Sequence, residues 1–244
     1  MVPYIVIMCG GHPGAPGWRD AKYIEQGRTL RQTAETAGIP WKAVLLVGPT
    51  GSGKTPLGQV LQKKGLWGRP CLHFDFGEAL RASAAQRTGP LTPGERDVVE
   101  RSLRQGTLLE DAHFPIAEKL LADFLAQRTA KSDTLVVLNG LPRHIGQAGA
   151  MESIIDLQAL VSLECGPATL WERIRLNAGG DRGGRADDTL KEVERRVGGF
   201  RSRTEPLLRY YREQRVPVLL LQVGTKTTAQ DIYGQLDPDG AGPV

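Results

Sequence analysis

The sequence predicts an α/β fold with a central parallel β-sheet of about five strands, covered by helices on both faces. Apolar runs with the length and branched content of buried strands alternate with segments whose apolar residues recur at helical spacing. A glycine-rich turn directly follows the first run, at the strand end where such sheets bind ligands. The predicted strands are residues 43–47, 71–76, 134–140, 159–164 and 216–223.

The chain has the composition of an ordinary globular protein, and its 244 residues are enough to bury a large core. Lys and Arg number 31 against 27 Asp and Glu, an excess too small to indicate nucleic-acid binding without a concentrated patch. No apolar run approaches the ~20 residues of a membrane span, and the opening stretch lacks the basic leader of a signal peptide. We therefore expect neither a nucleic-acid nor a membrane partner.

The three cysteines, Cys9, Cys71 and Cys165, are widely separated and form no C-x-x-C pair. Neither a disulfide framework nor a zinc cage is indicated. A reduced, cytoplasmic setting is the default for such a chain, and we expect a monomer.

Residues 1–40 are expected to be an extension, poorly ordered or ancillary to the main domain. Glycine and proline are too frequent at residues 10–17 to continue a regular element, and the polar stretch at 20–36 offers a helix only a thin apolar side. The main domain is predicted to span residues 41–237, followed by a loose tail at 238–244.

Residues 44–55, VLLVGPTGSGKT, match the phosphate-binding pattern G-x-x-x-x-G-K-[ST] at every position. The glycines let consecutive backbone N–H groups point at one oxyanion, and the positive end of the following helix adds to the attraction. Lys54 can reach the outer phosphates of a nucleoside triphosphate, and the Thr55 hydroxyl is placed to bind Mg²⁺. The residues predicted to hold the triphosphate are Gly48, Pro49, Thr50, Gly51, Ser52, Gly53, Lys54 and Thr55.

Helical segments follow the second strand, at about residues 76–130, without an intervening strand. This arrangement indicates either an insertion at a sheet edge or a small helical subdomain. One of these helices is predicted to begin at Thr92, which can cap it, with Pro93 in the first position and Glu95 in the third.

Polar residues and arginines gather downstream of the strands. Asp75, Asn139 and Glu164 lie at predicted strand ends, where parallel sheets bind their ligands. A glycine-rich loop at 178–188 cannot build its own core and is expected to move. The arginines around it are Arg173, Arg175, Arg182, Arg185, Arg195, Arg196, Arg201 and Arg203; of these, Arg195, Arg201 and Arg203 are expected to be solvated charges.

Four segments, in order, resemble adenylate kinases and related nucleoside monophosphate kinases. LNGLPRHIGQA at 138–148 resembles the family's LDGFPR...QA, and residues 184–211 resemble its GR-x-DD...R...TEP...YY. FGEALR at 76–81 resembles GDLLR, and LRQGTLLED at 103–111 resembles M-x-x-G-x-L-V-P-D. With the phosphate-binding loop, the resemblance covers about residues 42–237. It implies a P-loop kinase fold with a helical acceptor-binding insertion at 76–130 and a short lid at 177–188.

The resemblance also implies ATP and Mg²⁺ as cofactors and a nucleoside monophosphate, with AMP expected, as the acceptor. Catalysis in this reaction is positioning and charge stabilisation. Arg81 and Arg143 match residues that take the acceptor phosphate, and Gln147 matches one that reads the acceptor base. The residues implied at the acceptor site are Gly77, Arg81, Gly140, Arg143 and Gln147. Those implied in catalysis are Lys54, Arg143, Arg173, Arg185 and Arg196.

The sequence departs from the family pattern at three places. The family's Asp at the end of the third strand, which helps to hold the water shell of Mg²⁺, is Asn139 here. A neutral amide can still contact Mg²⁺ through a water that it orients, but it adds no negative charge. We therefore expect Asn139→Asp to raise turnover, by about 10- to 100-fold. Phe76 replaces the usual Thr, so the acceptor base is left open. The family's arginine near Asn177 is missing, and Arg182 is a candidate to replace it.

Two alternatives remain open. A P-loop kinase for a non-nucleotide acceptor would be compatible with Phe76, and a catalytically weak, nucleotide-binding regulatory protein would be compatible with Asn139.

Overall fold

The computed structural model describes residues 40–86, 89–128, 130–180 and 190–237. The extension expected at 1–40, apart from its last residue, and the tail expected at 238–244 lie outside these ranges. Most of the expected lid, with Arg182 and Arg185, also lies outside the described residues. Within the described ranges, no helix is long and apolar enough to cross a membrane.

The described strands form one parallel sheet in the order β2-β3-β1-β4-β5, which confirms the predicted α/β class. The strands are β1 (Trp41–Val47), β2 (Cys71–Asp75), β3 (Leu135–Asn139), β4 (Ile155–Glu164) and β5 (Val218–Gln222). The central strand β1 leads into the glycine-rich loop. The parallel register sets Asp75 opposite Asn139, so the ends of β2 and β3 are level with each other.

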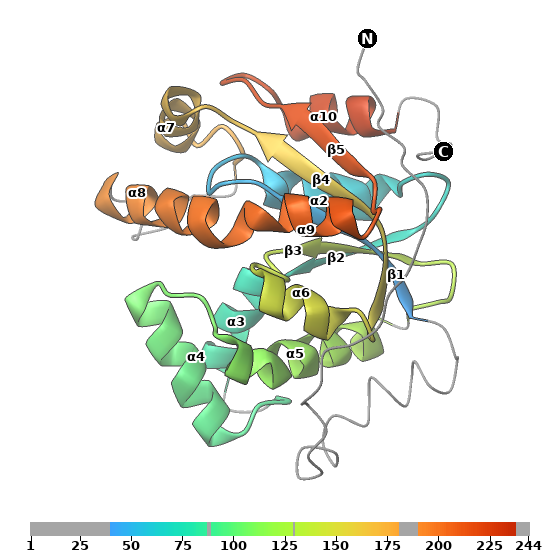
Figure 1. Cartoon of the computed structure of the whole chain (residues 1–244), viewed down its shortest axis with the longest axis vertical. Coiled ribbons are helices and arrows are strands. Elements are labelled where there is room, and N and C mark those ends of the chain that lie inside the picture. Colours follow the sequence, from blue (N-terminus) through green and yellow to red (C-terminus); the bar gives the residue numbers. More distant parts are fainter. Residues whose placement is uncertain (1–39, 87–88, 129, 181–189, 238–244) are drawn as a thin grey trace.

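The side chains of β1 alternate between two apolar layers because successive residues of a strand point to opposite faces. Val44 and Leu46 pack with α2 (Lys54–Lys64) and α10 (Ala229–Leu236). Leu45 and its odd-numbered neighbours pack with helices on the other face. Those helices are α3 (Phe76–Ala85), α5 (Phe114–Gln127), α6 (Ile145–Met151) and α9 (Pro206–Glu213). Figure 1 shows α3, α5 and α6 below the sheet. The sheet is thus covered on both faces.

Edge strand β2 leads directly into α3, and α4 (Pro93–Gln105) and the 3₁₀ turn η1 (Asp111–His113) follow before α5 returns to the sheet. Thr92 caps α4, and the reciprocal bonds of a capping box with Glu95 are present, which confirms the predicted helix start. Buried residues of α3, α4 and α5 belong to the same core as the sheet. This favours an insertion at the sheet edge over a separate subdomain.

The chain from Leu190 to Glu213 forms three successive helical elements. α8 (Leu190–Gly199) runs into the π-helical turn η2 (Phe200–Thr204) and then into α9. The Glu205 amide donates to the Phe200 carbonyl at 2.8 Å, the spacing of a π turn. The glycines and the proline in this stretch therefore leave the path of the helix continuous (Figure 1).

Candidate active site

The glycine-rich loop between β1 and α2 curls at the carboxyl edge of the sheet. Gly51 and Gly53 have φ angles of 83° and 103°, in the region that favours glycine. A Cβ atom on Gly51 would lie 2.5 Å from the Ile174 side chain. The loop therefore requires glycine for its conformation as well as for space, and α2 begins immediately after it at Lys54.

The Lys54 ammonium lies over this loop. Its Nζ atom donates to the carbonyl oxygens of Gly48, at 2.7 Å, and Pro49, at 2.9 Å. Neutral carbonyls are weaker partners for an ammonium than charged phosphate oxygens are. A bound triphosphate can therefore draw this positive charge onto its own oxygens over a short distance.

Three polar side chains meet where β2 and β3 end, beside the first turn of α2. The Thr55 hydroxyl donates to Asp75 Oδ2 at 2.7 Å. The Asn139 amide donates to the same Asp75 oxygen at 2.8 Å and to the Thr55 oxygen at 3.0 Å. The sequence predicts Asp75 at a strand end without indicating a particular role for it. The signal that identifies it is the strand register, which sets it opposite Asn139.

Asp75 brings a negative charge to this cluster. Burial raises the pKa of its carboxyl, but hydrogen bonds from the Thr55 hydroxyl and the Glu78 amide, with the charges of His73 and Arg81, outweigh burial and hold the pKa below its ordinary value. The carboxyl is therefore ionised at neutral pH.

These residues fit a Mg²⁺ ion that arrives with a nucleotide. Among the described residues, no three His, Cys, Asp or Glu side chains gather as an all-protein metal cage. Mg²⁺ is commonly held by one or two carboxylates, with water and substrate phosphates as its other ligands. The Thr55 hydroxyl and the Asp75 carboxylate provide a donor set of that kind.

Arginines from three elements lie close enough for their charges to affect one another. Burial is the largest cause that lowers the pKa of Arg143, the nearby charges of Arg196 and Arg81 lower it further, and Asp75 opposes them. Arg81 comes from α3, Arg143 from the loop after β3, and Arg196 from α8. The structure thus brings together three of the arginines that the sequence singles out.

Two glycines leave room for these guanidinium groups. A Cβ atom on Gly77 would lie 3.4 Å from Arg81 Nη1, and one on Gly140 would lie 3.3 Å from Arg143 Nη2. Gly140 also has a φ angle of 84°. Both glycines lie where the sequence places the acceptor site.

Gln147, expected to read a base, is only 2% exposed and is bonded at both ends of its amide. Its oxygen accepts from the Arg143 backbone N–H at 2.9 Å, and its nitrogen donates to the Leu109 carbonyl at 3.2 Å. The His144 ring contacts the same carbonyl. In this conformation Gln147 braces the turn that carries Arg143, and its role toward a base stays a prediction.

Phe76 is 3% exposed and belongs to the core. Its ring is 6.2 Å from that of Phe74. The ring is therefore not available to stack on an acceptor base in this conformation.

Arg173 is 2% exposed and braces the underside of the phosphate-binding loop. Its guanidinium donates to the Gly51 carbonyl at 3.2 Å and to the carbonyls of Gly224 and Thr227 at 2.7 and 2.8 Å. Arg173 thus ties the loop to the segment after β5. A direct contact with phosphate stays a prediction.

Arg195, which is exposed, and Arg203, which is half-buried, each have a partner in the protein in addition to contact with solvent. Arg203 forms a bidentate ion pair with Glu110, and Arg195 donates to the Gly106 carbonyl at the end of α4. The Thr204 hydroxyl donates to the Arg143 carbonyl at 2.8 Å. Folding lays α8 and η2 against the α4–η1 segment, a contact that helical periodicity alone does not reveal.

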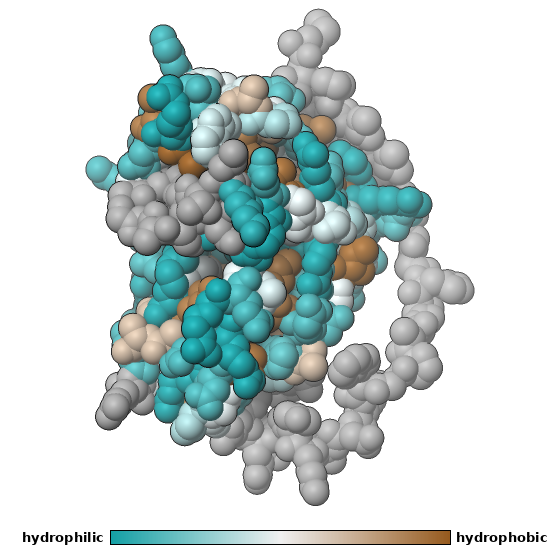
Figure 2. All heavy atoms as spheres, turned by 90° about the vertical axis from the view of Figure 1, so that its left-hand side faces the viewer, coloured by the Kyte–Doolittle hydropathy of each residue, from teal (hydrophilic) through white to brown (hydrophobic). Residues whose placement is uncertain are grey.

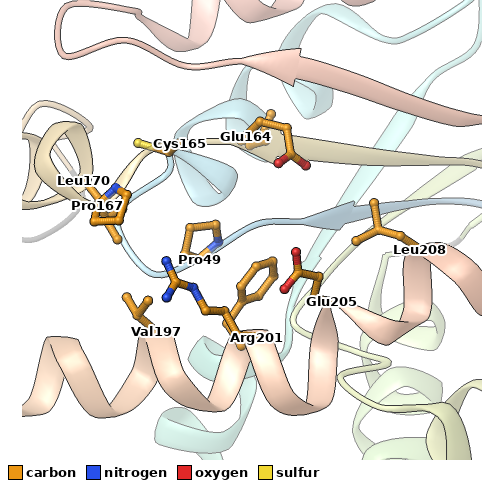
Figure 3. A pocket seen from close by; sticks show the side chains of 11 residues that line it. Pro49, Glu164, Cys165, Pro167, Leu170, Val197, Arg201, Glu205 and Leu208 are labelled. Carbon is orange, nitrogen blue, oxygen red and sulfur yellow. The ribbon is translucent and has the colours of Figure 1, made fainter.

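A cavity of about 170 Å³ lies between the phosphate-binding loop and η2. Arg201 points from the helix toward Pro49, with Glu205 and Glu164 nearby (Figure 3).

Figure 2 shows the end of the molecule on the left of Figure 1, where α4, α7 (Pro167–Arg175) and the start of α8 lie. Hydrophilic residues cover most of that face.

Residues 47–194 match a protein family described as AAA domain. The adenylate kinase of Thermus thermophilus is 30% identical to the chain over 201 residues, which cover 80% of this chain and 95% of the relative. The adenylate kinase of Nitrobacter hamburgensis is 30% identical over 182 residues, which cover 70% of this chain and 80% of the relative.

Two solved structures are also similar to the chain. A thymidylate kinase from Candida albicans has a TM-score of 0.49 and 14% identity, over 81% of this chain and 89% of that one. A gluconokinase from Sinorhizobium meliloti has a TM-score of 0.44 and 18% identity, over 79% of this chain and 87% of that one.

Proposed function

Because the chain belongs to the adenylate kinase family of P-loop kinases, we propose that it transfers the terminal phosphoryl group of Mg²⁺-bound ATP to a nucleoside monophosphate, with AMP as the preferred acceptor. One observation carries this proposal. Arg81 and Arg196 lie close enough to Arg143 for their charges to lower the pKa of its guanidinium, and Asp75, at the end of β2, lies close enough to oppose them. The name that the curated relatives carry supports AMP as the acceptor.

The donor site is the loop from Gly48 to Thr55 at the start of α2. Its backbone N–H groups and the positive end of the helix attract the phosphates of ATP. Lys54 leaves the loop carbonyls for the outer phosphates. Arg173 holds the loop in place from below through the Gly51 carbonyl.

The acceptor site is the space beside Gly77 and Gly140, where Arg81 and Arg143 take the phosphate of the monophosphate. A guanidinium presents parallel N–H donors that match two phosphate oxygens. Two arginines can therefore hold a dianionic phosphate in line with the terminal phosphate of ATP. Gln147, on the turn that carries Arg143, is the residue proposed to face the base.

In the transfer, an oxygen of the acceptor phosphate forms a bond to the terminal phosphorus of ATP as the bond to the bridging oxygen breaks and ADP leaves. Negative charge spreads over the transferred oxygens, and Lys54, Arg143 and Arg196 stabilise it. Arg185, in the lid, is proposed to add a further charge on closure, which also excludes water. Bound Mg²⁺ would neutralise charge on the outer phosphates of ATP. Because the acceptor phosphate is already ionised, no histidine base is needed.

A coupled assay for diphosphate formation tests the proposal, with MgATP and each of AMP, CMP, UMP, GMP and dTMP as the acceptor. We expect kcat/KM to be highest for AMP. Binding of ATP without product from any monophosphate would instead support a regulatory, nucleotide-binding protein. ATP turnover only with an acceptor that is not a nucleotide would support the other alternative kinase.

A further inference from the structure

We propose that Asp75 supplies the negative charge for the Mg²⁺ of the donor nucleotide, in place of the acid that is missing at Asn139. The charge has moved from the end of β3 to the end of the neighbouring strand β2. This inference rests on the proposed function in one respect, that the donor is a Mg²⁺-bound nucleoside triphosphate.

The hydrogen bonds around Thr55 leave its oxygen ready for a cation. A hydroxyl has one proton to donate and two lone pairs. The Thr55 proton goes to Asp75 Oδ2 at 2.7 Å, and the Asn139 amide uses one lone pair at 3.0 Å. One lone pair of the Thr55 oxygen remains beyond these two bonds, beside a carboxylate oxygen that can approach the same ion directly or through water.

The two oxygens of Asp75 have separate tasks. Oδ1 accepts from the Glu78 backbone N–H at 3.0 Å and so caps the start of α3. Oδ2 faces the other way, toward Thr55 and Asn139. A purely structural role as helix cap would account for Oδ1 alone. The contact of Oδ2 with the residue that the loop motif assigns to Mg²⁺ is the observation that a cap does not explain.

Asn139 fits this arrangement as a neutral partner. Its amide nitrogen donates to the Asp75 oxygen at 2.8 Å, which a carboxylate at that position could not do. Two carboxylates at such a distance cannot both ionise without a large cost. The gain in turnover that the sequence suggests for Asn139→Asp alone is therefore no longer expected, because it would set a second negative charge against Asp75.

The test measures binding of the β,γ-imido analogue of ATP by calorimetry, with and without Mg²⁺, and needs no acceptor. We expect Asp75→Asn to reduce the Mg²⁺-dependent gain in affinity by about 10- to 100-fold. Binding without metal should be equal or tighter, because a negative charge near the triphosphate has been removed. Asn is also a good helix cap, so α3 should be retained.

A second test returns the negative charge from the end of β2 to the end of β3. The double variant Asp75→Asn with Asn139→Asp should recover most of the Mg²⁺-dependent gain that Asp75→Asn loses. Glu164→Gln is the matched control, since it removes a carboxylate at the end of β4 that accepts from the Ser162 hydroxyl, and it should leave the gain unchanged.

Equal weakening of binding with and without Mg²⁺ in Asp75→Asn would overturn the inference and leave Asp75 as a helix cap. An unchanged Mg²⁺-dependent gain would overturn it as well. Because no acceptor is present, failure of the acceptor assay would reject the proposed transfer without affecting this result, and the two failures are distinguishable.

Discussion

Arg203 in η2 forms a bidentate ion pair with Glu110 after α4, in which Nη1 and Nη2 donate to the two carboxylate oxygens at 2.8 and 2.9 Å. With the bond from Arg195 to the Gly106 carbonyl, this pair holds α8 and η2 against the α4–η1 segment. The two helical segments are thus in contact in this conformation.

A double-mutant cycle of Arg203→Ala and Glu110→Ala should give a coupling of about 0.5 kcal/mol in the free energy of unfolding. The value is small because the side chains are 34% and 62% exposed, and water screens the pair. Chemical denaturation of the four proteins measures it. The coupling should shrink further in 1 M salt; a coupling that salt does not reduce would contradict the electrostatic origin.

The same pair predicts a pH dependence. The hydrogen bond from Arg203 is the largest cause that lowers the pKa of Glu110 below its ordinary value of 4.5. A carboxyl whose pKa is lower in the folded state contributes stability above its unfolded pKa and loses it as the pH falls through its folded pKa. The coupling should therefore be full at pH 7 and should weaken as the pH falls below 4.5 through the folded pKa of Glu110. A coupling that does not weaken in acid would refute the assignment.

Arg81→Ala should raise the KM for AMP by about 10- to 100-fold, the effect of losing a hydrogen bond between charged groups. Arg81 is exposed, so the melting temperature should hardly change. The KM for ATP should also stay nearly constant, because the donor loop is not touched. Arg101→Ala, at an exposed position on α4, is the matched control and should alter neither KM. A rise in the KM for ATP equal to that for AMP would place Arg81 elsewhere than at the acceptor phosphate.

Gln147→Leu should lower stability by about 2 kcal/mol, because it leaves the Arg143 N–H and the Leu109 carbonyl without this partner in a buried place. Thermal and chemical unfolding measure the loss. If the amide only reads the base, stability would instead be unchanged while the preference for AMP over the other monophosphates is lost. A combined result would assign both roles to the residue.

Gly58→Ala should destabilise the chain although Gly58 lies within α2, where alanine normally favours a helix by about 1 kcal/mol. The added Cβ would lie 2.2 Å from the His73 ring, and overpacking of this kind costs about 1–3 kcal/mol. Gly234→Ala in α10 is the matched control, with no atom within 4 Å of the new Cβ, and should be neutral or stabilising. Stabilisation by both substitutions would contradict the packing at His73.

Much of the fold could be predicted from the sequence because its signals are local. The loop motif, the capping box at Thr92 and the helix at Ala229–Leu236 depend on residues close together in the chain. Other elements were missed: α6 is short and contains glycines, and the start of β4 carries an exposed Asp156 that hid the strand. These segments are specified by what they pack against.

The candidate site was predicted only in part, for a related reason. The motifs identify Lys54 and Arg143 directly. The role of Asp75 depends on β2 and β3 being neighbours in register, and that of Arg203 depends on η2 lying against the α4–η1 segment. Neither relationship can be deduced from the spacing of residues along the chain. Similarly, nothing in the local pattern shows that the Phe76 ring is turned into the core.

The central claim is phosphoryl transfer between two nucleotides, and the amount of ADP formed per ATP consumed tests it most directly. The purified chain with MgATP and AMP should form two ADP for each ATP, as quantified by chromatography, and almost none when AMP is omitted. One ADP per ATP, at a rate that does not depend on AMP, would mean hydrolysis or another acceptor and would contradict the account.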